Sequence, residues 1–206
     1  MTTIVAVRKH GRTCVVSDSL TVYGNRKEAG TNLIADSSKL FFWENAIIGF
    51  AGSATWKHVF LDFLRSQKKL FHPFTHEVLL SSFSTLWRSF RSAYSLESSF
   101  NENSYYSPDC RVVVATQENM YELTLHGVLI SNKNMLAIGG GFPFAYGAMR
   151  ALDCSSLNSS DVAMASIRAA AAWDPTTSGP FSGWLISERG EFNEFATGRQ
   201  ATNTKG

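Results

Sequence analysis

The residues that could do chemistry begin at the second position of the chain, where Thr2 precedes an apolar run at residues 4–7. Removal of Met1 would give Thr2 a free α-amine beside its own hydroxyl. An α-amine titrates near ~7.7–8.0, so it is partly neutral at neutral pH and can accept the hydroxyl proton. One residue would then carry both a nucleophile and a base. Second-position threonine is common, so the pattern favours catalysis only when other polar residues surround it.

Further polar residues stand at the ends of other predicted elements. Asp18 follows the second apolar run of the chain, and Lys39 begins the third. Asp174 and Ser178 follow a long segment with helical periodicity. Each has a simpler explanation: a turn-capping aspartate, an exposed strand lysine or a helix-ending Asp-Pro pair. A catalytic interpretation therefore requires that the fold bring these residues to Thr2.

Hydrophobic periodicity predicts the elements that would do so. Consecutive apolar residues, in place of alternating ones, indicate strands covered on both faces. Such strands are expected at residues 2–7, 13–17, 39–42, 46–50, 111–116, 120–125, 128–131, 135–138, 181–187 and 191–196. Apolar residues three and four apart predict helices after a Ser53 cap, after Pro73, at 144–152, and from a Ser159 or Ser160 cap to Trp173.

The order of these elements is strands, two helices, strands, two helices, strands. Doubly covered strands in this order predict an α+β fold, a four-layer αββα sandwich of two stacked sheets with helices on each outer face. The length fits one domain over residues 1–206, in which the polar residues 197–206 form a frayed tail.

The composition narrows the class of protein. The chain has 206 residues, of which 44% are hydrophobic and 17% charged, with a net charge of +2. These values are typical of a globular protein that binds neither nucleic acid nor a membrane surface. The three scattered cysteines are expected to be buried thiols in a reducing, cytoplasmic setting, with no signal peptide ahead of Thr2. The five histidines have no metal-binding spacing, so neither a metal nor another cofactor is expected.

Five short motifs, taken in their order along the chain, resemble those of the proteasome β-subunits and the HslV-type peptidases, a family of N-terminal-nucleophile threonine hydrolases. Within that family they are most similar to the small proteasome homologues of β-proteobacteria. The resemblance covers roughly residues 2 to 187, and its motifs are Thr-Thr-Ile-Val-Ala-Val at 2–7, Ser-Asp-Ser at 17–19, Ile-Gly-Phe-Ala-Gly at 48–52, Ala-Ile-Gly-Gly-Gly at 137–141, and Asp174 with Ser178-Gly179.

The resemblance implies a role for each candidate at the start of the chain. Thr2 would attack a peptide carbonyl, with its own amine acting through a water as general base. Asp18 would pair with a lysine near the nucleophile, and Lys39, which begins a Lys-Leu-Phe sequence, fits that place. Counting back from the later glycine motif without a gap gives Ser37 instead, and Lys27 is a poorer candidate.

The resemblance also implies roles for residues of the later motifs. Gly49 would direct its N–H at the developing oxyanion, and Asp174 would orient the Thr2 amine through Ser178 or water. Relatives carry a serine near the amine at the third place of an Ile-Gly-Ser-Gly motif, and this chain has Gly140 there. The substitution removes a hydroxyl from the polar network.

The resemblance therefore implies a self-compartmentalising threonine-type endopeptidase. It would form stacked homo-oligomeric rings of six or seven subunits and hydrolyse unfolded proteins. A separate ATP-dependent unfoldase would deliver them, because this chain has no P-loop. The alternative is a proteasome-like ring that is catalytically impaired and serves as a binding or scaffold assembly, which Gly140 favours. A small-molecule amidase with the same nucleophile is a third, weaker possibility.

Overall fold

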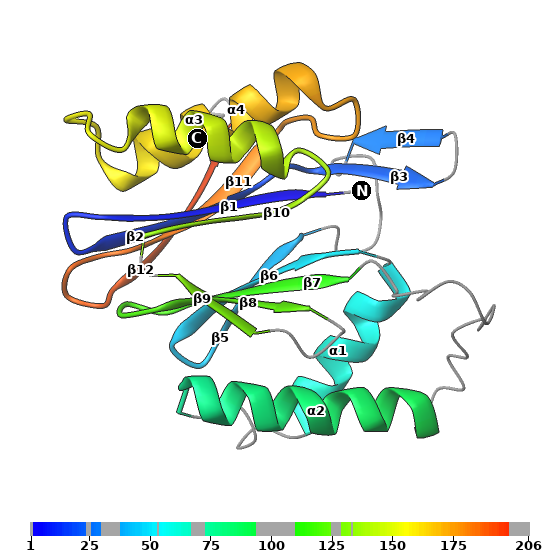
Figure 1. Cartoon of the computed structure of the whole chain (residues 1–206). Coiled ribbons are helices and arrows are strands. Elements are labelled where there is room, and N and C mark those ends of the chain that lie inside the picture. Colours follow the sequence, from blue (N-terminus) through cyan, green and yellow to red (C-terminus); the bar gives the residue numbers. More distant parts are fainter. Residues whose placement is uncertain are drawn as a thin grey trace, which may run out of the picture.

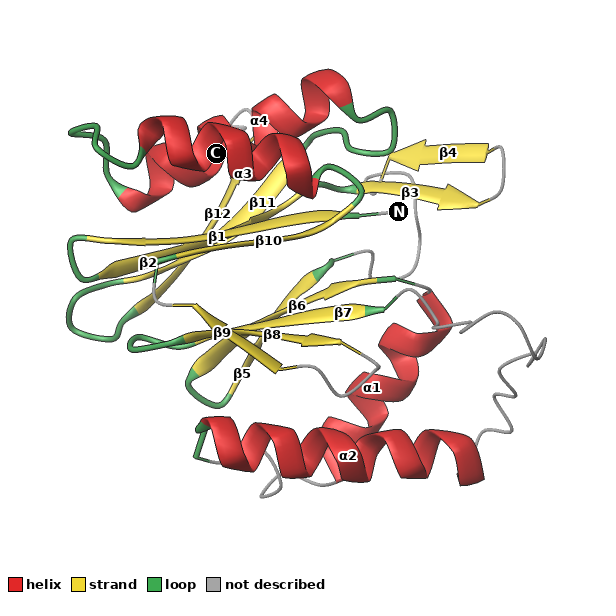
Figure 2. Ribbon diagram, in the orientation of Figure 1, coloured by secondary structure: helices red, strands yellow, loops and turns green. Residues whose placement is uncertain are grey.

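Two five-stranded antiparallel sheets face each other in the computed structural model, and helices cover the outer side of each sheet (Figure 1). The structure describes residues 2–23, 26–29, 38–52, 54–66, 73–93, 110–124, 129–132 and 134–197. The layers run helix, sheet, sheet, helix, as the colouring by element in Figure 2 makes plain. This arrangement confirms the predicted αββα sandwich.

The first sheet has the order β10-β1-β2-β11-β12. Its strands are β10 (Met135–Gly139), β1 (Thr3–Lys9), β2 (Arg12–Ser17), β11 (Phe181–Ile186) and β12 (Phe192–Thr197). The helices α3 (Phe142–Leu152) and α4 (Ser159–Trp173) pack on its outer face. Because β1 lies inside this sheet, the first residues of the chain are held between two neighbouring strands.

The second sheet has the order β5-β6-β7-β8-β9. Its strands are β5 (Leu40–Trp43), β6 (Ala46–Ala51), β7 (Arg111–Ala115), β8 (Met120–Thr124) and β9 (Leu129–Asn132). The helices α1 (Ala54–Ser66) and α2 (His76–Ala93) cover it, and a separate hairpin consists of β3 (Leu20–Tyr23) and β4 (Arg26–Ala29).

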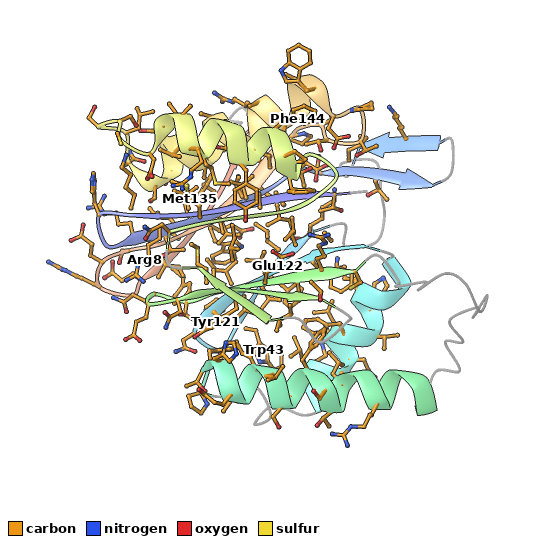
Figure 3. All side chains as sticks on the ribbon, in the orientation of Figure 1. Arg8, Trp43, Tyr121, Glu122, Met135 and Phe144 are labelled. Carbon is orange, nitrogen blue, oxygen red and sulfur yellow. The ribbon has the colours of Figure 1, made fainter. Side chains whose placement is uncertain are left out.

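The side chains of β1 explain why its sequence is apolar at successive positions. Ile4 and Ala6 belong to the cluster between the two sheets, which side chains fill in Figure 3. Val5 and Val7 belong to the cluster between the first sheet and its helices. All four are at most 1% exposed, so both faces of the strand are buried. Burying Ile4, Val5 and Val7 is worth about 1.5–3 kcal/mol each, which fixes the register of β1.

Three details of the sequence interpretation need correction. α3 begins at Phe142, two residues earlier than expected, because Pro143 fits the first helical turn, where no N–H is needed. The cap of α4 is Asn158, whose side chain accepts the N–H of Asp161, instead of either serine. Cys154 is exposed, whereas the other two cysteines are buried. The Ser53 cap and the tail at residues 198–206 lie outside the described residues.

Candidate active site

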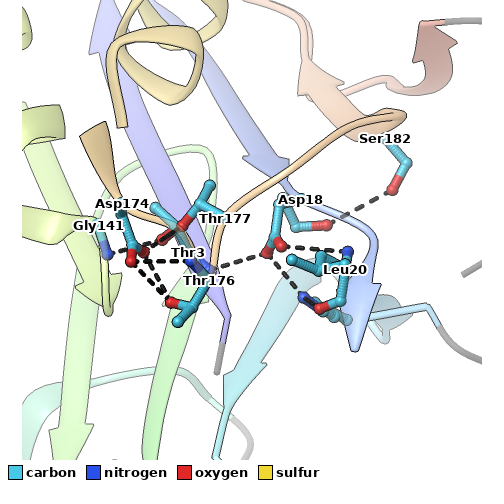
Figure 4. Close-up of polar contacts among 10 residues, drawn as sticks. Thr3, Asp18, Leu20, Gly141, Asp174, Thr176, Thr177 and Ser182 are labelled. Atoms are coloured by element: carbon cyan, nitrogen blue, oxygen red, sulfur yellow. Dashed lines mark hydrogen bonds and ion pairs between the residues drawn. The ribbon is translucent and has the colours of Figure 1, made fainter. Parts of the chain in front are cut away.

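The predicted site residues meet at one end of the sandwich, where several elements begin or end. The start of β1, the turn after β2, the start of β5, the end of β10 and the loop after α4 all contribute. Hydrogen bonds join them: the N–H of Asp18 donates to the Thr3 carbonyl at 3.2 Å, and the N–H of Gly140 donates to the Thr2 carbonyl at 2.9 Å. Figure 4 shows the polar contacts at this end.

Asp18 is the centre of the first half of the site. Its Oδ1 accepts the Thr3 N–H at 2.8 Å and the Lys39 Nζ at 2.7 Å, while its Oδ2 accepts the Leu20 N–H at 3.2 Å. The Lys39 ammonium also donates to the Leu20 carbonyl at 2.7 Å. The carboxylate therefore ties the start of β1 to the lysine at the start of β5.

The ion pair between Asp18 and Lys39 is buried, with side-chain exposures of 0% and 8%. Burial raises the pKa of Asp18, and the Lys39 charge opposes that change. Burial likewise lowers the pKa of Lys39, against the attraction of Asp18. Each group therefore depends on the other to stay ionised in this setting.

The sequence offered Lys27 and Ser37 as alternatives to Lys39, and the structure places the first of them away from Asp18. Lys27 is exposed, and its Nζ donates to the Pro175 carbonyl at 2.7 Å instead of to Asp18. Ser37 lies outside the described residues. Lys39 is the lysine whose Nζ contacts Asp18.

Thr2 is held by its main chain against the glycines that follow β10. Its side chain is buried at 6% exposed, and its carbonyl accepts the Gly140 N–H. Gly139 has φ +94, and a Cβ there would lie 1.6 Å from the Thr2 carbonyl oxygen. Only glycine permits both this conformation and this close approach.

The neighbouring residue Thr3 has a structural hydroxyl. Its Oγ1 accepts the Gly141 N–H at 2.9 Å and lies 2.6 Å from the Thr177 Oγ1. Thr177 in turn donates to the Asp174 Oδ2 at 2.5 Å, so the Thr3 hydroxyl is the donor toward Thr177. With these partners, and complete burial, Thr3 anchors β1 to the loop after α4.

Asp174 is held by two threonines of its own loop. The Thr176 Oγ1 lies 2.8 Å and 2.9 Å from the two carboxylate oxygens, and the Thr176 N–H donates to Oδ1 at 3.0 Å. Burial raises the pKa of Asp174, but hydrogen bonds from Thr177 and Thr176 outweigh it and leave the pKa below its usual value. Asp174 is therefore a carboxylate at neutral pH.

Ser178 does not have the contact that the sequence suggested. Its residue is exposed, and its contacts with the site run through the main chain: its carbonyl accepts the Ser19 N–H at 3.2 Å, and its own N–H hydrogen-bonds Asp18. The hydroxyls against Asp174 are those of Thr176 and Thr177. Aspartate often accepts the N–H of the residue two positions later, and Asp174 does so with Thr176. The sequence Asp-Pro-Thr-Thr is compatible with this turn, which brings the threonine hydroxyls to the carboxylate.

Gly49 is also misplaced for its expected role. It lies within β6, pairing with Leu40 on one side and Val113 on the other, and a Cβ there would lie 3.0 Å from Ile4. The N–H of Phe50 points at β5, so the N–H of Gly49 points at β7 and is part of the sheet.

The glycine at the open end of β6 is Gly52. It is exposed, has φ +145 and lies directly after the last strand residue. Because Phe50 pairs across to Lys39, the strand reaches this glycine at the same end as the ion pair. Gly49 and Gly52 belong to the same motif of the sequence. They differ because Gly49 lies inside β6 and Gly52 lies just beyond its last residue.

The described residues contain no cluster of three or more histidine, cysteine, aspartate or glutamate side chains suited to a metal ion. Among the helices of the described chain, none has the length and apolar character to cross a bilayer.

Comparison with solved structures gives the relationship. BPH, the bacterial proteasome homologue of Thiobacillus denitrificans, in complex with epoxomicin, has a TM-score of 0.80 and 25% identity, covering 90% of this chain and 98% of that one. A eukaryotic HslV from Trypanosoma brucei has a TM-score of 0.65 and 22% identity, covering 89% and 98%. The likeness to BPH supports a proteasome/HslV-type family, and at 22% identity the likeness to HslV concerns the fold. No family model matches the sequence.

A third neighbour extends the comparison of the fold. The Anbu (Gly-1) mutant from Hyphomicrobium sp. strain MC1 has a TM-score of 0.68 at 12% identity, covering 95% of this chain and 86% of that one. At that identity the likeness concerns the fold alone. Together the neighbours support a proteasome-type subunit with an N-terminal-nucleophile hydrolase fold.

Proposed function

We propose that this chain is a threonine-type endopeptidase subunit whose nucleophile is Thr2 after removal of Met1. The observation that carries the proposal is the buried Asp18–Lys39 pair, which is joined by hydrogen bonds to the first strand beside Thr2. A buried ion pair costs solvation and contributes little to stability, so it indicates a functional use of the charge. The similarity to a proteasome homologue supports the same reading.

In the proposed reaction, the α-amine of Thr2 accepts the hydroxyl proton, directly or through a water, as the oxygen attacks the peptide carbonyl. A tetrahedral oxyanion forms, the amine returns the proton to the leaving amide nitrogen, and an ester to Thr2 remains. Water then attacks this ester with the amine again as base. The Lys39 ammonium lowers the pKa of nearby groups that lose a proton, which favours a neutral amine.

We further propose Gly52, in place of Gly49, as the main-chain donor to the oxyanion. A donor of this kind is worth about 2.7–4 kcal/mol in the transition state. Gly52 is exposed at the end of β6, whereas the N–H of Gly49 lies within the sheet.

Covalent labelling with a threonine-directed peptide epoxyketone tests the function. The reagent requires both the hydroxyl and the free amine of the same threonine. We expect intact mass to show loss of Met1 and one adduct per chain, mapped to Thr2, and protein that retains Met1 to stay unlabelled. In a crystal structure of the adduct, the reagent's oxygen should lie within hydrogen-bond distance of the Gly52 N. A processed chain that neither labels nor cleaves peptides would contradict the proposal, and support the scaffold alternative.

The proposed assembly is a set of stacked rings of six or seven copies with the Thr2 sites inside, fed with unfolded protein by a separate ATP-driven unfoldase. The likeness to proteasome/HslV-type neighbours suggests a ring-forming oligomer. The surface also fits an oligomer, because Phe144 of α3 is 43% exposed (Figure 3) and Trp173 at the end of α4 is 74% exposed. Exposed aromatics of this size suggest a covered surface.

Light scattering of the purified protein measures the assembly. We expect a mass of twelve or fourteen chains, with the count set by the family resemblance and the closure of cyclic contacts. Trp173→Asp should reduce that mass, and Arg168→Asp, at an exposed position of the same helix, is the control for added charge. A parent protein that remains monomeric and cleaves folded substrates would exclude the compartment.

A further inference from the structure

The loop after α4 places a hydroxyl where the family serine would have been. Gly140 lacks a side chain, but the space above it is occupied. A Cβ on Gly140 would lie 2.7 Å from the Thr176 Oγ1 and 2.8 Å from the Asp174 Oδ2. Both atoms are side-chain ends from the other side of the site, so a second residue fills the volume that a serine at position 140 would use.

We propose that Thr176 is a positioning residue that holds the Thr2 α-amine for proton transfer, in place of the serine that Gly140 replaces. The inference rests on the proposed function, since it concerns the same amine. Its first support is proximity: Gly140 donates its N–H to the Thr2 carbonyl at 2.9 Å, and Thr176 lies over the same glycine. Thr176 and Thr2 thus lie against the same glycine.

Its second support is the direction of the hydrogen bonds. The one proton of the Thr176 hydroxyl is directed at the Asp174 carboxylate, 2.8 Å and 2.9 Å from its two oxygens. The lone pairs of the Thr176 oxygen are then left to accept a hydrogen bond from the amine. Thr177 already uses one of its two lone pairs, because its oxygen accepts from the Thr3 hydroxyl at 2.6 Å. The described residues place no donor on the Thr176 oxygen, which lies over Gly140, so Thr176 is the better acceptor of this loop for the Thr2 amine.

The first test compares Thr176→Val with Thr176→Ser in processed protein. Valine keeps the shape, and the turn bond from the main-chain N–H of residue 176 to Asp174 remains possible. We expect kcat to fall about tenfold in the valine variant, the scale of one lost hydrogen bond, with KM unchanged. Serine should restore kcat. Thr85→Val on the exposed side of α2 is the matched control. A valine variant with the parent kcat would overturn the inference.

The second test does not need turnover. The pKa of the Thr2 amine is measured from the pH dependence of its acylation, followed on the N-terminal peptide by mass spectrometry. The charged groups at this end of the sandwich are Asp174, Asp18 and Lys39, and Lys57 of α1 acts electrostatically on Lys39. Loss of the acceptor should lower the amine pKa by about half a unit or more in Thr176→Val. An unchanged pKa contradicts the role of Thr176 even if the chain is an active peptidase. A shifted pKa in a chain that hydrolyses nothing would instead reject only the proposed function.

The third test exchanges the hydroxyl between the two positions. Gly140→Ser alone crowds the Thr176 Oγ1 and the Asp174 carboxylate, and Thr176→Ala alone removes the hydroxyl, so both should be slower than the parent. In the combined variant the Thr176 oxygen no longer crowds the new serine, only the end of the Asp174 side chain must shift, and the serine can replace the lost hydroxyl. We expect the double variant to exceed each single variant in kcat. Losses that simply multiply would show that the two positions do not share one role.

Discussion

Processed Thr2→Ala protein is expected to show no measurable peptide turnover while keeping its fold. The variant removes the attacking oxygen and leaves the amine, and removal of a nucleophile costs on the order of 10⁶-fold in kcat. The side chain of Thr2 takes no part in the network around Thr3, so circular dichroism and the midpoint of thermal unfolding should match those of the parent.

Thr2→Ser is the matched variant, because it returns a hydroxyl to the same place. We expect it to recover turnover and epoxyketone labelling in part. Intact mass must show loss of Met1 in all three proteins, since an α-amine is needed in each. Thr2→Ala protein that cleaves peptides at the parent rate would rule out Thr2 as the nucleophile.

Lys39→Ala is expected to cost both activity and stability. The activity loss should be on the order of 10²–10⁴-fold, the scale of acid–base assistance. Removal of the ammonium leaves the Asp18 carboxylate buried with main-chain donors alone, at a cost of about 3–5 kcal/mol in the free energy of unfolding. Urea unfolding and peptide turnover measure the two effects.

The pH dependence of this stability loss has a definite sign. Without Lys39, burial raises the pKa of Asp18 further, so the folded chain binds a proton that the unfolded chain has released. The loss should therefore be largest above the folded pKa of Asp18 and should shrink as the pH falls through that pKa toward the unfolded value. A loss that is constant between neutral and acid pH would contradict the pairing.

Two controls separate charge from packing. Lys27→Ala removes an exposed lysine that donates to the Pro175 carbonyl, and it should leave turnover within the range of the parent. Asp18→Asn combined with Lys39→Met removes both charges, and it should recover most of the stability but none of the activity. Recovery of activity in this double variant would show that the pair only supports the fold.

The layers of the fold could be predicted because the spacing of apolar residues along the sequence indicates which faces of each strand and helix are buried. Successive apolar residues in β1 required cover on both faces, and the described clusters provide it. The period of α1 placed Val59, Phe60, Phe63 and Leu64 on one face, and all four are buried. Strand pairing and helix packing depend on many residues at once, so single errors at the ends of elements did not matter.

The site was less predictable because it depends on single residues at those ends. Lys39 directly precedes β5 and contacts Asp18, whereas the gapless count from Gly49 gave Ser37, and the pairing of β5 with β6 is needed to choose between positions two residues apart. Gly49 and Gly52 differ by three positions, and the last pair of β6 decides between them.

Ser178 and the two threonines before it all carry a hydroxyl that could donate to Asp174, so the sequence does not distinguish them. Which hydroxyl meets Asp174 depends on how the loop folds back, and this needs backbone coordinates. The consecutive Thr2 and Thr3 pose the same problem at the other end of the chain. Successive side chains of an extended chain point to opposite faces, so Thr2 and Thr3 have different surroundings. The Thr3 hydroxyl is hydrogen-bonded within the fold, which leaves Thr2 as the candidate nucleophile.

The unequal exposure of the cysteines gives the protein a built-in site for a spectroscopic probe. Cys14 is buried, and burial raises the pKa of its thiol to about 12, so it will not react at neutral pH. Cys110 is buried as well, which leaves Cys154, in the turn after α3, as the exposed thiol. A maleimide dye or spin label should therefore attach once per chain without mutagenesis. Energy transfer or dipolar coupling between labels on neighbouring copies would then yield the spacing, and hence the symmetry, of whatever assembly the protein forms in solution.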